Sequence, residues 1–143
     1  MTQAPLMDRI RITEDYDVPR VINGGWQLSA GHALERPLDL ADASRAFNRL
    51  IDMGFDTFDC ADIYTGVEDF FGGIIRERRK AGLRLPQIHT KFVPDLNDLA
   101  NVTPAYVENI ITRSLRRLGV ERLDAVQFHW WDYSVPGMVD VAG

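Results

Sequence analysis

The chain has 143 residues, of which 45% are hydrophobic and 26% charged, a composition typical of a folded protein with a single core. Its formal net charge of −5, without a basic run, argues against nucleic acid and anionic membranes as partners. The single cysteine, Cys60, excludes a disulfide framework and a CxxC metal or redox pair. Because there is no signal-like N-terminus and no apolar run of ~18 residues, we expect a cytoplasmic protein that does not cross a membrane.

Two short β-prone runs near the N-terminus predict a hairpin. They are Arg9–Thr13 and Val18–Asn23, joined by a polar turn at 14–17. The second run can continue as the first strand of a larger sheet, which ends at Gly24-Gly25. Residues 1–7 predict a disordered tail, so that one domain covers residues 8–143.

Beyond this hairpin, helix signals alternate with strand signals. Apolar residues with helical spacing, capping residues and terminal glycines predict helices at 39–53, 68–80 and 103–118. Strands are expected at 55–60, 87–92 and 123–129, and loops at 26–37, at 93–102 and from Trp130 to the end. This alternation predicts an α/β fold with about four parallel strands covered by helices.

Two other patterns have structural interpretations. No Gly-x-Gly-x-x-Gly motif follows the first strand, so a Rossmann nucleotide site has no support, and Gly72-Gly73 indicates close helix packing. The basic clusters at 76–80 and 113–122 lie late in predicted helices, where cations suit the helix dipole. We therefore expect them to form solvated helix faces.

The predicted strands end on candidate catalytic residues. Asp59, Lys91 and His129 end three consecutive strands, and Tyr64 lies in the loop after the first of them. Side chains alternate along a strand, so the polar residues at the strand ends share one face of the sheet. The intervening apolar residues, which suit packing under helices, are Phe58, Ile88, Val126 and Phe128. The carboxyl ends of parallel strands are where α/β folds carry their chemistry.

A carboxylate, an ammonium, a phenol and an imidazole can together protonate a carbonyl group. A free phenol is a weak acid near pH 7, because its pKa is ~10. An ammonium beside it favours the phenolate, and a carboxylate keeps the ammonium charged and aimed. An imidazole on the far side can hydrogen-bond the substrate oxygen. The pattern therefore predicts proton delivery.

The segments GFDTFDCADIYTGVE (54–68), IHTK (88–91) and QFHW (127–130) resemble the aldo-keto reductases, (β/α)8 barrels that reduce aldehydes and ketones to alcohols with NADPH. In the family pattern Gly-x-x-x-x-Asp-Thr-Ala-x-x-Tyr-Gly-x-x-Glu, the acidic and phenolic positions match, while Cys60 and Thr65 depart from it. The resemblance implies that the general acid is Tyr64, tuned by Asp59 and Lys91, with His129 orienting the carbonyl. It also implies that Gly25, Trp26 and Asp59 border the nicotinamide, and it assigns no metal.

The family's chains are about twice this length, consistent with the ~250 residues of a complete barrel. The resemblance therefore implies the N-terminal half of a (β/α)8 TIM barrel, preceded by the hairpin. Most contacts to the NADPH cofactor would lie in the other half. We expect a truncated product whose 143 residues alone bind NADPH weakly or not at all and self-associate through open sheet edges.

Three alternatives to a reductase acting on a small carbonyl substrate stay open. A metal-dependent hydrolase could bind zinc through Asp59, His89 and His129, although Lys91 would share that pocket. A Schiff-base lyase would use a neutral Lys91, against the effect of the nearby carboxylate. The third is a catalytically inactive fragment or half-barrel binding subunit. Within the site, Trp130 and Trp131 either line a substrate pocket or cover the inner wall.

Overall fold

The computed structural model describes residues 7–30 and 38–143. In chain order its elements are β1 (Arg9–Thr13), β2 (Tyr16–Pro19), β3 (Asn23–Gly24), α1 (Leu40–Asp52), β4 (Thr57–Asp59), α2 (Val67–Lys80), β5 (Gln87–Phe92), α3 (Pro104–Leu118), β6 (Ala125–Phe128) and α4 (Met138–Ala142). Short 3-10 helices occupy Trp26–Leu28 and Leu96–Asn101. The predicted tail falls almost entirely outside the described residues. Within them, no helix has the length and apolar character needed to span a bilayer.

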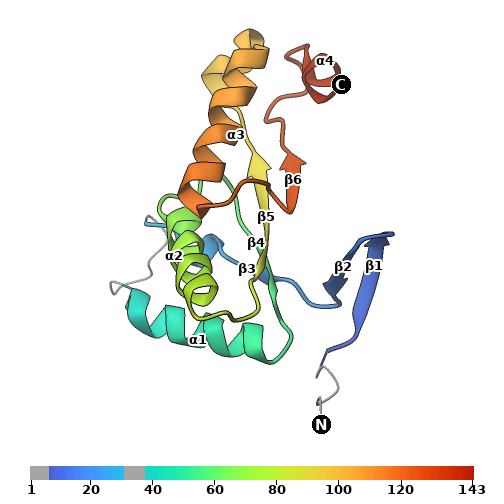
Figure 1. Cartoon of the computed structure of the whole chain (residues 1–143). Coiled ribbons are helices and arrows are strands. Elements are labelled where there is room, and N and C mark those ends of the chain that lie inside the picture. The colour runs from blue at the N-terminus through green and yellow to red at the C-terminus, as the bar shows by residue number, and fades with distance from the viewer. Residues whose placement is uncertain (1–6, 31–37) are drawn as a thin grey trace.

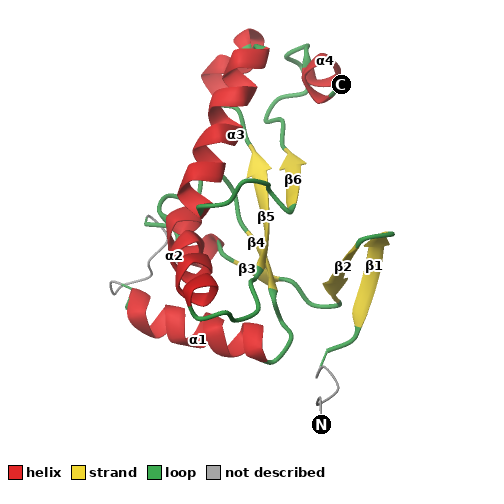
Figure 2. Ribbon diagram, in the orientation of Figure 1, coloured by secondary structure: helices red, strands yellow, loops and turns green. Residues whose placement is uncertain are grey.

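The sheet confirms the predicted α/β fold. Its four parallel strands are hydrogen-bonded in the order β3-β4-β5-β6, and helices α1, α2 and α3 lie along one side of them (Figure 1). Strands β1 and β2 form a separate antiparallel pair on the other side (Figure 2). Arg9 fastens this hairpin to the amino ends of the sheet strands through hydrogen bonds to Asp56 and Gln87. The carboxyl ends therefore stay clear of the hairpin.

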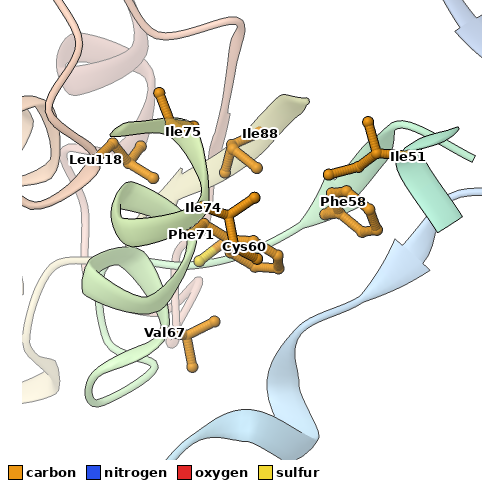
Figure 3. Close-up of a cluster of buried hydrophobic side chains, with 9 residues drawn as sticks. All are labelled: Ile51, Phe58, Cys60, Val67, Phe71, Ile74, Ile75, Ile88 and Leu118. Carbon is orange, nitrogen blue, oxygen red and sulfur yellow. The ribbon is translucent and has the colours of Figure 1, made fainter. Parts of the chain in front are cut away.

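Apolar residues from α1, β4, α2, β5 and α3 build one core between the sheet and its helices. Its buried members are Ile51, Phe58, Cys60, Val67, Phe71, Ile74, Ile75, Ile88 and Leu118 (Figure 3). Phe58 and Phe71 stack at 5.3 Å between ring centroids. Burying each such ring stabilises the fold by about 1.5–3 kcal/mol, so this core fixes β4 and α2, the two elements that flank the loop carrying Tyr64.

The predicted cap residues explain where the helices begin and end. The Asp39 side chain accepts hydrogen bonds from the first amides of α1, and Thr103 does the same for α3, with Pro104 in its first turn. Gly54 follows α1 at φ 95°, and Gly119 ends α3 at φ 67°, conformations that favour glycine. These local signals are strong enough to be read without the fold.

The second hairpin strand was placed too late in the sequence. It begins at Tyr16 rather than Val18 and ends at Pro19, so the chain leaves the hairpin before it reaches β3 at Asn23. The Tyr16 hydroxyl lies 2.8 Å from Nε2 of His89, and Asp17 pairs with Arg9. Because of these contacts, Tyr16 and Asp17 belong to strand β2 and not to the predicted turn at 14–17.

Other expectations were wrong in detail. A short helix, α4, occupies part of the C-terminal stretch expected to be a loop, and 3-10 helices occupy parts of the predicted loops at 26–37 and 93–102. Val126 was expected to pack under a helix, but it is 43% exposed. Strand β6 is an edge strand of the sheet, and α3 packs against β5 instead.

Candidate active site

Asp59 and Lys91 form an ion pair at the carboxyl end of the sheet. Lys91 Nζ lies 2.8 Å from Oδ1 and 2.7 Å from Oδ2 of Asp59, and it donates a third hydrogen bond, of 2.8 Å, to the carbonyl oxygen of Cys60. The side chains are 18% (Lys91) and 32% (Asp59) exposed. An ammonium group has three hydrogens, so these three acceptors can engage all of them. The group is thereby held charged and in one place.

Tyr64 lies beside this ion pair, in the loop between β4 and α2. Lys91 Nζ is 5.2 Å from the centroid of the Tyr64 ring, within the range of a cation–π contact. The loop is closed by hydrogen bonds from Tyr64 N to Ala61 O (3.1 Å) and from Val67 N to Tyr64 O (3.0 Å). Gly66 then starts α2 at φ 80°. The phenol is half-buried and held by a short, hydrogen-bonded turn.

A cavity of about 270 Å³ opens between Tyr64, Lys91 and His129. Its other lining residues are Trp26, Ala61, Ile63, Val93 and Trp131. His129 directly follows β6, and its backbone N–H donates to Phe92 O at 3.0 Å. Its ring is nearly perpendicular to that of Trp131, with centroids 4.6 Å apart. The phenol, ammonium and imidazole therefore share one apolar-walled cavity.

The two tryptophans after β6 have different surroundings. Trp131 lines the cavity and donates from Nε1 to Pro94 O at 2.9 Å. Trp130 is buried, and its Nε1 is within hydrogen-bonding distance of the carbonyl oxygens of Asp132 and Val135. Trp130 thus stabilises the segment after β6, and only Trp131 takes the position of a substrate-contacting aromatic.

Gly25 and Trp26, the residues expected at the nicotinamide, follow β3. Gly25 N donates to Asp59 O at 2.8 Å, and a Cβ at Gly25 would lie 3.0 Å from that oxygen and from side-chain atoms of Val67 and Phe71. Close packing therefore accounts for this glycine. Trp26 is 46% exposed and forms one wall of the cavity.

The cavity suits the ring end of a nicotinamide cofactor better than its phosphates. Trp26 and Ile63 offer apolar surface next to the phenol of Tyr64. Among the described lining residues, Lys91 is the one side chain with a permanent positive charge, and its hydrogens are directed at Asp59 and Cys60. The described residues that line the cavity therefore fit the reactive ring of the cofactor, and none of them supplies a free cation to its phosphate groups.

A buried polar network beneath the Tyr64 loop was missed from the sequence. Asp62 pairs with Arg113 (3.0 Å), and Glu68 pairs with Arg117 (3.3 Å) and accepts from Thr90 Oγ1 (2.7 Å). Burial raises the pKa of Asp62 to about 6, against the opposing effects of Arg113 and a backbone amide. Both arginines had been assigned to a solvated helix face, but each reaches a buried carboxylate. In the sequence, the two arginines are four residues apart and lie next to the buried positions of α3, and this spacing could have indicated that they reach buried groups.

The basic cluster at 76–80 needs the same correction at one position. Arg78 is buried, with 3% of its surface exposed. Its guanidinium donates to Asn48, Asp52 and the carbonyl oxygen of Arg84. These bonds join α2 to α1 and to the turn after α2, so Arg78 is a structural residue.

The residues proposed as zinc ligands are used in other ways. His89 contacts the Tyr16 hydroxyl, and burial lowers its pKa, although the charges of Asp124 and Asp59 act in the opposite direction. Within residues 7–30 and 38–143, no three His, Cys, Asp or Glu side chains are grouped so as to hold a metal ion. Cys60 is buried in the core, and burial raises the pKa of its thiol to about 12.

Comparison with known proteins identifies the family. Residues 20–143 match the sequence profile of the Aldo/keto reductase family. Similar solved structures include the protein PA4992 of Pseudomonas aeruginosa, with 20% identity, a TM-score of 0.70 and coverage of 92% of this chain and 50% of that chain. Aldo-keto reductase AKR11C1 from Bacillus halodurans, in its holo form, has 23% identity, a TM-score of 0.68 and coverage of 94% and 43%. Aldo-keto reductase AKR2E4 from Bombyx mori, in complex with NADP, has 22% identity, a TM-score of 0.63 and coverage of 87% and 38%.

The fold and the profile match agree. The chain belongs to the Aldo/keto reductase family, and its sheet and helices correspond to part of the fold of these structures. It spans half or less of the length of each similar structure named above. The resemblance inferred from the sequence is thereby confirmed at the level of family and fold.

Proposed function

We propose that this chain provides the proton-delivery site of an NADPH-dependent reductase that converts an aldehyde or ketone to an alcohol. The observation that carries the proposal is the Lys91 ammonium, held 2.7 Å from Asp59 and 5.2 Å from the centre of the Tyr64 ring. Membership of the Aldo/keto reductase family supports an oxidoreductase, and the Bombyx mori neighbour was solved with NADP.

In this mechanism Tyr64 is the general acid. Its hydroxyl donates a proton to the carbonyl oxygen as negative charge develops there, and the nearby Lys91 ammonium stabilises the phenolate that remains. Asp59 keeps the ammonium in place. His129 donates a hydrogen bond to the same oxygen from the other side of the cavity, which orients the carbonyl.

When bound, NADPH supplies the hydride. In this proposal Gly25, Trp26 and Asp59 would border its nicotinamide ring; Trp26 and Trp131 line the cavity, and Gly25 N donates to Asp59 O. Water exclusion by the apolar walls strengthens the electrostatic effect of Lys91 on the reacting oxygen.

The experiment measures NADPH oxidation by a full-length chain with a complete barrel, against a panel of aldehydes and ketones. Tyr64→Phe should lower kcat by at least 100-fold while NADPH binding, followed by its fluorescence, stays unchanged. Lys91→Met should also lower kcat, because it removes the charge that stabilises the phenolate. A Tyr64→Phe variant with unaltered kcat would refute the proposed acid.

A matched control uses Tyr16, another tyrosine whose side chain contacts a polar side chain that is distant in the sequence. Tyr16 hydrogen-bonds His89 at the other end of the sheet, and burial raises the pKa of Tyr16 to about 12. Tyr16→Phe removes the same hydroxyl from a part-buried hydrogen bond and should leave kcat within a factor of about two. The comparison separates loss of an acid from loss of a part-buried phenol.

A further inference from the structure

The carboxyl group of Asp62 lies two residues before Tyr64, and the mechanism above gives it no task. Its side chain is fully buried, at 0% exposure. Burying a carboxylate costs several kcal/mol unless other groups compensate its charge and fill its hydrogen-bonding positions. The compensating groups are the amide of Val93, directly after β5, and the guanidinium of Arg113 on α3.

Asp62 ties the Tyr64 loop to the strand end that carries Lys91. Its backbone N donates to Lys91 O at 3.3 Å, and its Oδ1 accepts from Val93 N at 3.1 Å. In the parallel register of β4 and β5, the Val93 amide would next bond the Asp62 carbonyl oxygen. The Asp62 side chain replaces that backbone acceptor. The segment after β4 therefore leaves the sheet at Asp62, and Asp62 remains hydrogen-bonded to Lys91 O and to Val93 N.

Helix α3 holds the same residue from the other side. Arg113 Nη2 donates to Asp62 Oδ2 at 3.0 Å, and Arg117 Nη1 donates to the Asp62 carbonyl oxygen at 2.9 Å. Every oxygen of Asp62 therefore has a partner. Because Arg117 also reaches Glu68 in the first turn of α2, the arginines connect both ends of the loop to one helix.

The position of Tyr64 depends on this anchor. The turn from Ala61 to Val67 is closed by two short-range backbone hydrogen bonds, so a displacement of Asp62 is passed on to the phenol. Asp62 is not among the residues that line the described cavity. Any effect it has on the chemistry therefore acts through other residues, and its hydrogen bonds connect it to the loop that carries Tyr64 and to the strand end that carries Lys91.

We propose that Asp62 is a positioning residue that sets the Tyr64 ring against the Lys91 ammonium, with Arg113 and Arg117 bracing it from α3. The catalytic part of this inference rests on the reductase function proposed above. Its geometric part stands on the hydrogen bonds alone and can be measured without substrate.

The geometric test uses the ring current of Tyr64. The side-chain end of Lys91 lies near the Tyr64 ring, so the ring current should change the chemical shift of the Lys91 Cε protons in a ¹H–¹³C spectrum. The difference in this chemical shift between the wild type and Tyr64→Leu defines the size of the displacement. Asp62→Asn should lose most of it, because the amide keeps the shape of the carboxylate and removes its charge. Arg113→Met should lose part of it, and Arg113→Lys should restore that part.

Asp56→Asn is the matched control. Asp56 is also a buried carboxylate (side chain 2% exposed) with two arginine partners, Arg9 and Arg84, but it precedes β4 at the opposite end of the sheet. The Asp56→Asn variant can lose as much stability as Asp62→Asn, yet it should leave the chemical shifts of the Lys91 protons unchanged. The pair therefore separates positioning from general destabilisation.

The kinetic test compares the same variants with a carbonyl substrate. Misplacing the acid by about 1 Å should lower kcat by 10- to 100-fold in Asp62→Asn, with little change in KM, and Asp56→Asn should keep its kcat. Unchanged Lys91 signals and unchanged kcat in both Asp62→Asn and Arg113→Met would overturn the positioning role. A wild-type full-length chain that binds NADPH but reduces no carbonyl would refute the reductase, while the Lys91 signals would still decide the positioning.

Discussion

Alanine substitution at the two adjacent glycines of α2 should have opposite effects on stability. A Cβ built on Gly72 overlaps the carbonyl oxygen of Arg117 and lies 3.1 Å from its carbonyl carbon. At Gly73 the nearest atom is a guanidinium nitrogen of Arg76, at 4.0 Å. Both positions are inside a helix, where alanine is intrinsically better than glycine by about 0.5–1 kcal/mol. The pair thus isolates the packing contribution.

The expected magnitude at Gly72 follows from the contact that must give way. The obstacle is backbone, so α2 and α3 must separate by about 1 Å, and overpacking of this kind costs about 1–3 kcal/mol. The same movement stretches the hydrogen bonds from Arg117 to Glu68 and to Asp62. Since Glu68 is 1% exposed, weakening its ion pair adds to the loss. We expect a net loss of about 2–4 kcal/mol for Gly72→Ala.

The assay is urea unfolding followed by circular dichroism, with the free energy of unfolding extrapolated to water. Gly73→Ala should unfold at higher urea than the wild type, and Gly72→Ala at lower urea. If both variants gained stability, the close approach of α2 and α3 would be wrong, and the placement of Arg117 next to the Tyr64 loop would fail with it.

Three further predictions concern the buried charges, the core and the open sheet. Burial raises the folded-state pKa of Asp62 to about 6, so the folded state binds more protons than the unfolded state between pH 4 and 6. As the pH rises through that range, the wild type should therefore lose about 3 kcal/mol of stability relative to Asp62→Asn. Parallel curves of stability against pH for the two proteins would contradict this. Phe58→Ala should cost about 3–5 kcal/mol in urea unfolding, because the ring is fully buried and stacked on Phe71, whereas Tyr133→Ala, at a residue 79% exposed, should change stability by less than about 0.5 kcal/mol. The 143 residues alone should self-associate through the β3 and β6 edges, with Val126 exposed on β6, and a single monomeric species in sedimentation velocity would contradict this.

Where local chemistry decides the structure, the sequence was sufficient. Strand β5 was predicted with its observed bounds, and its burial alternates along Gln87–Phe92, although His89, Thr90 and Lys91 are three polar residues in succession. Helix α3 was predicted because Thr103-Pro104 and Gly119 mark its ends independently of its packing. The meeting of Asp59 with Lys91 followed from strand-end positions alone, since parallel neighbours align their carboxyl ends.

What the sequence left undetermined depends on contacts between distant residues. Tyr16 has the polar neighbours of a turn residue, and its partner His89 lies 73 positions away. Arg113 and Arg117 resemble solvated helix residues until α2 and the Tyr64 loop are placed beside α3. The spacing of Asp62 from Tyr64 is visible in the sequence, but its bond to Val93 requires the end of β5.

The most direct measurement of the central claim is isotope transfer. A full-length chain with a complete barrel is given a reactive carbonyl compound and NADPH deuterated at the transferable position, and the product is analysed by mass spectrometry and NMR. We predict one deuterium on the carbinol carbon, formed by the wild type and at least 100-fold more slowly by Tyr64→Phe. An alcohol without deuterium, or an equal rate in the two proteins, would contradict a reductase in which Tyr64 delivers the proton.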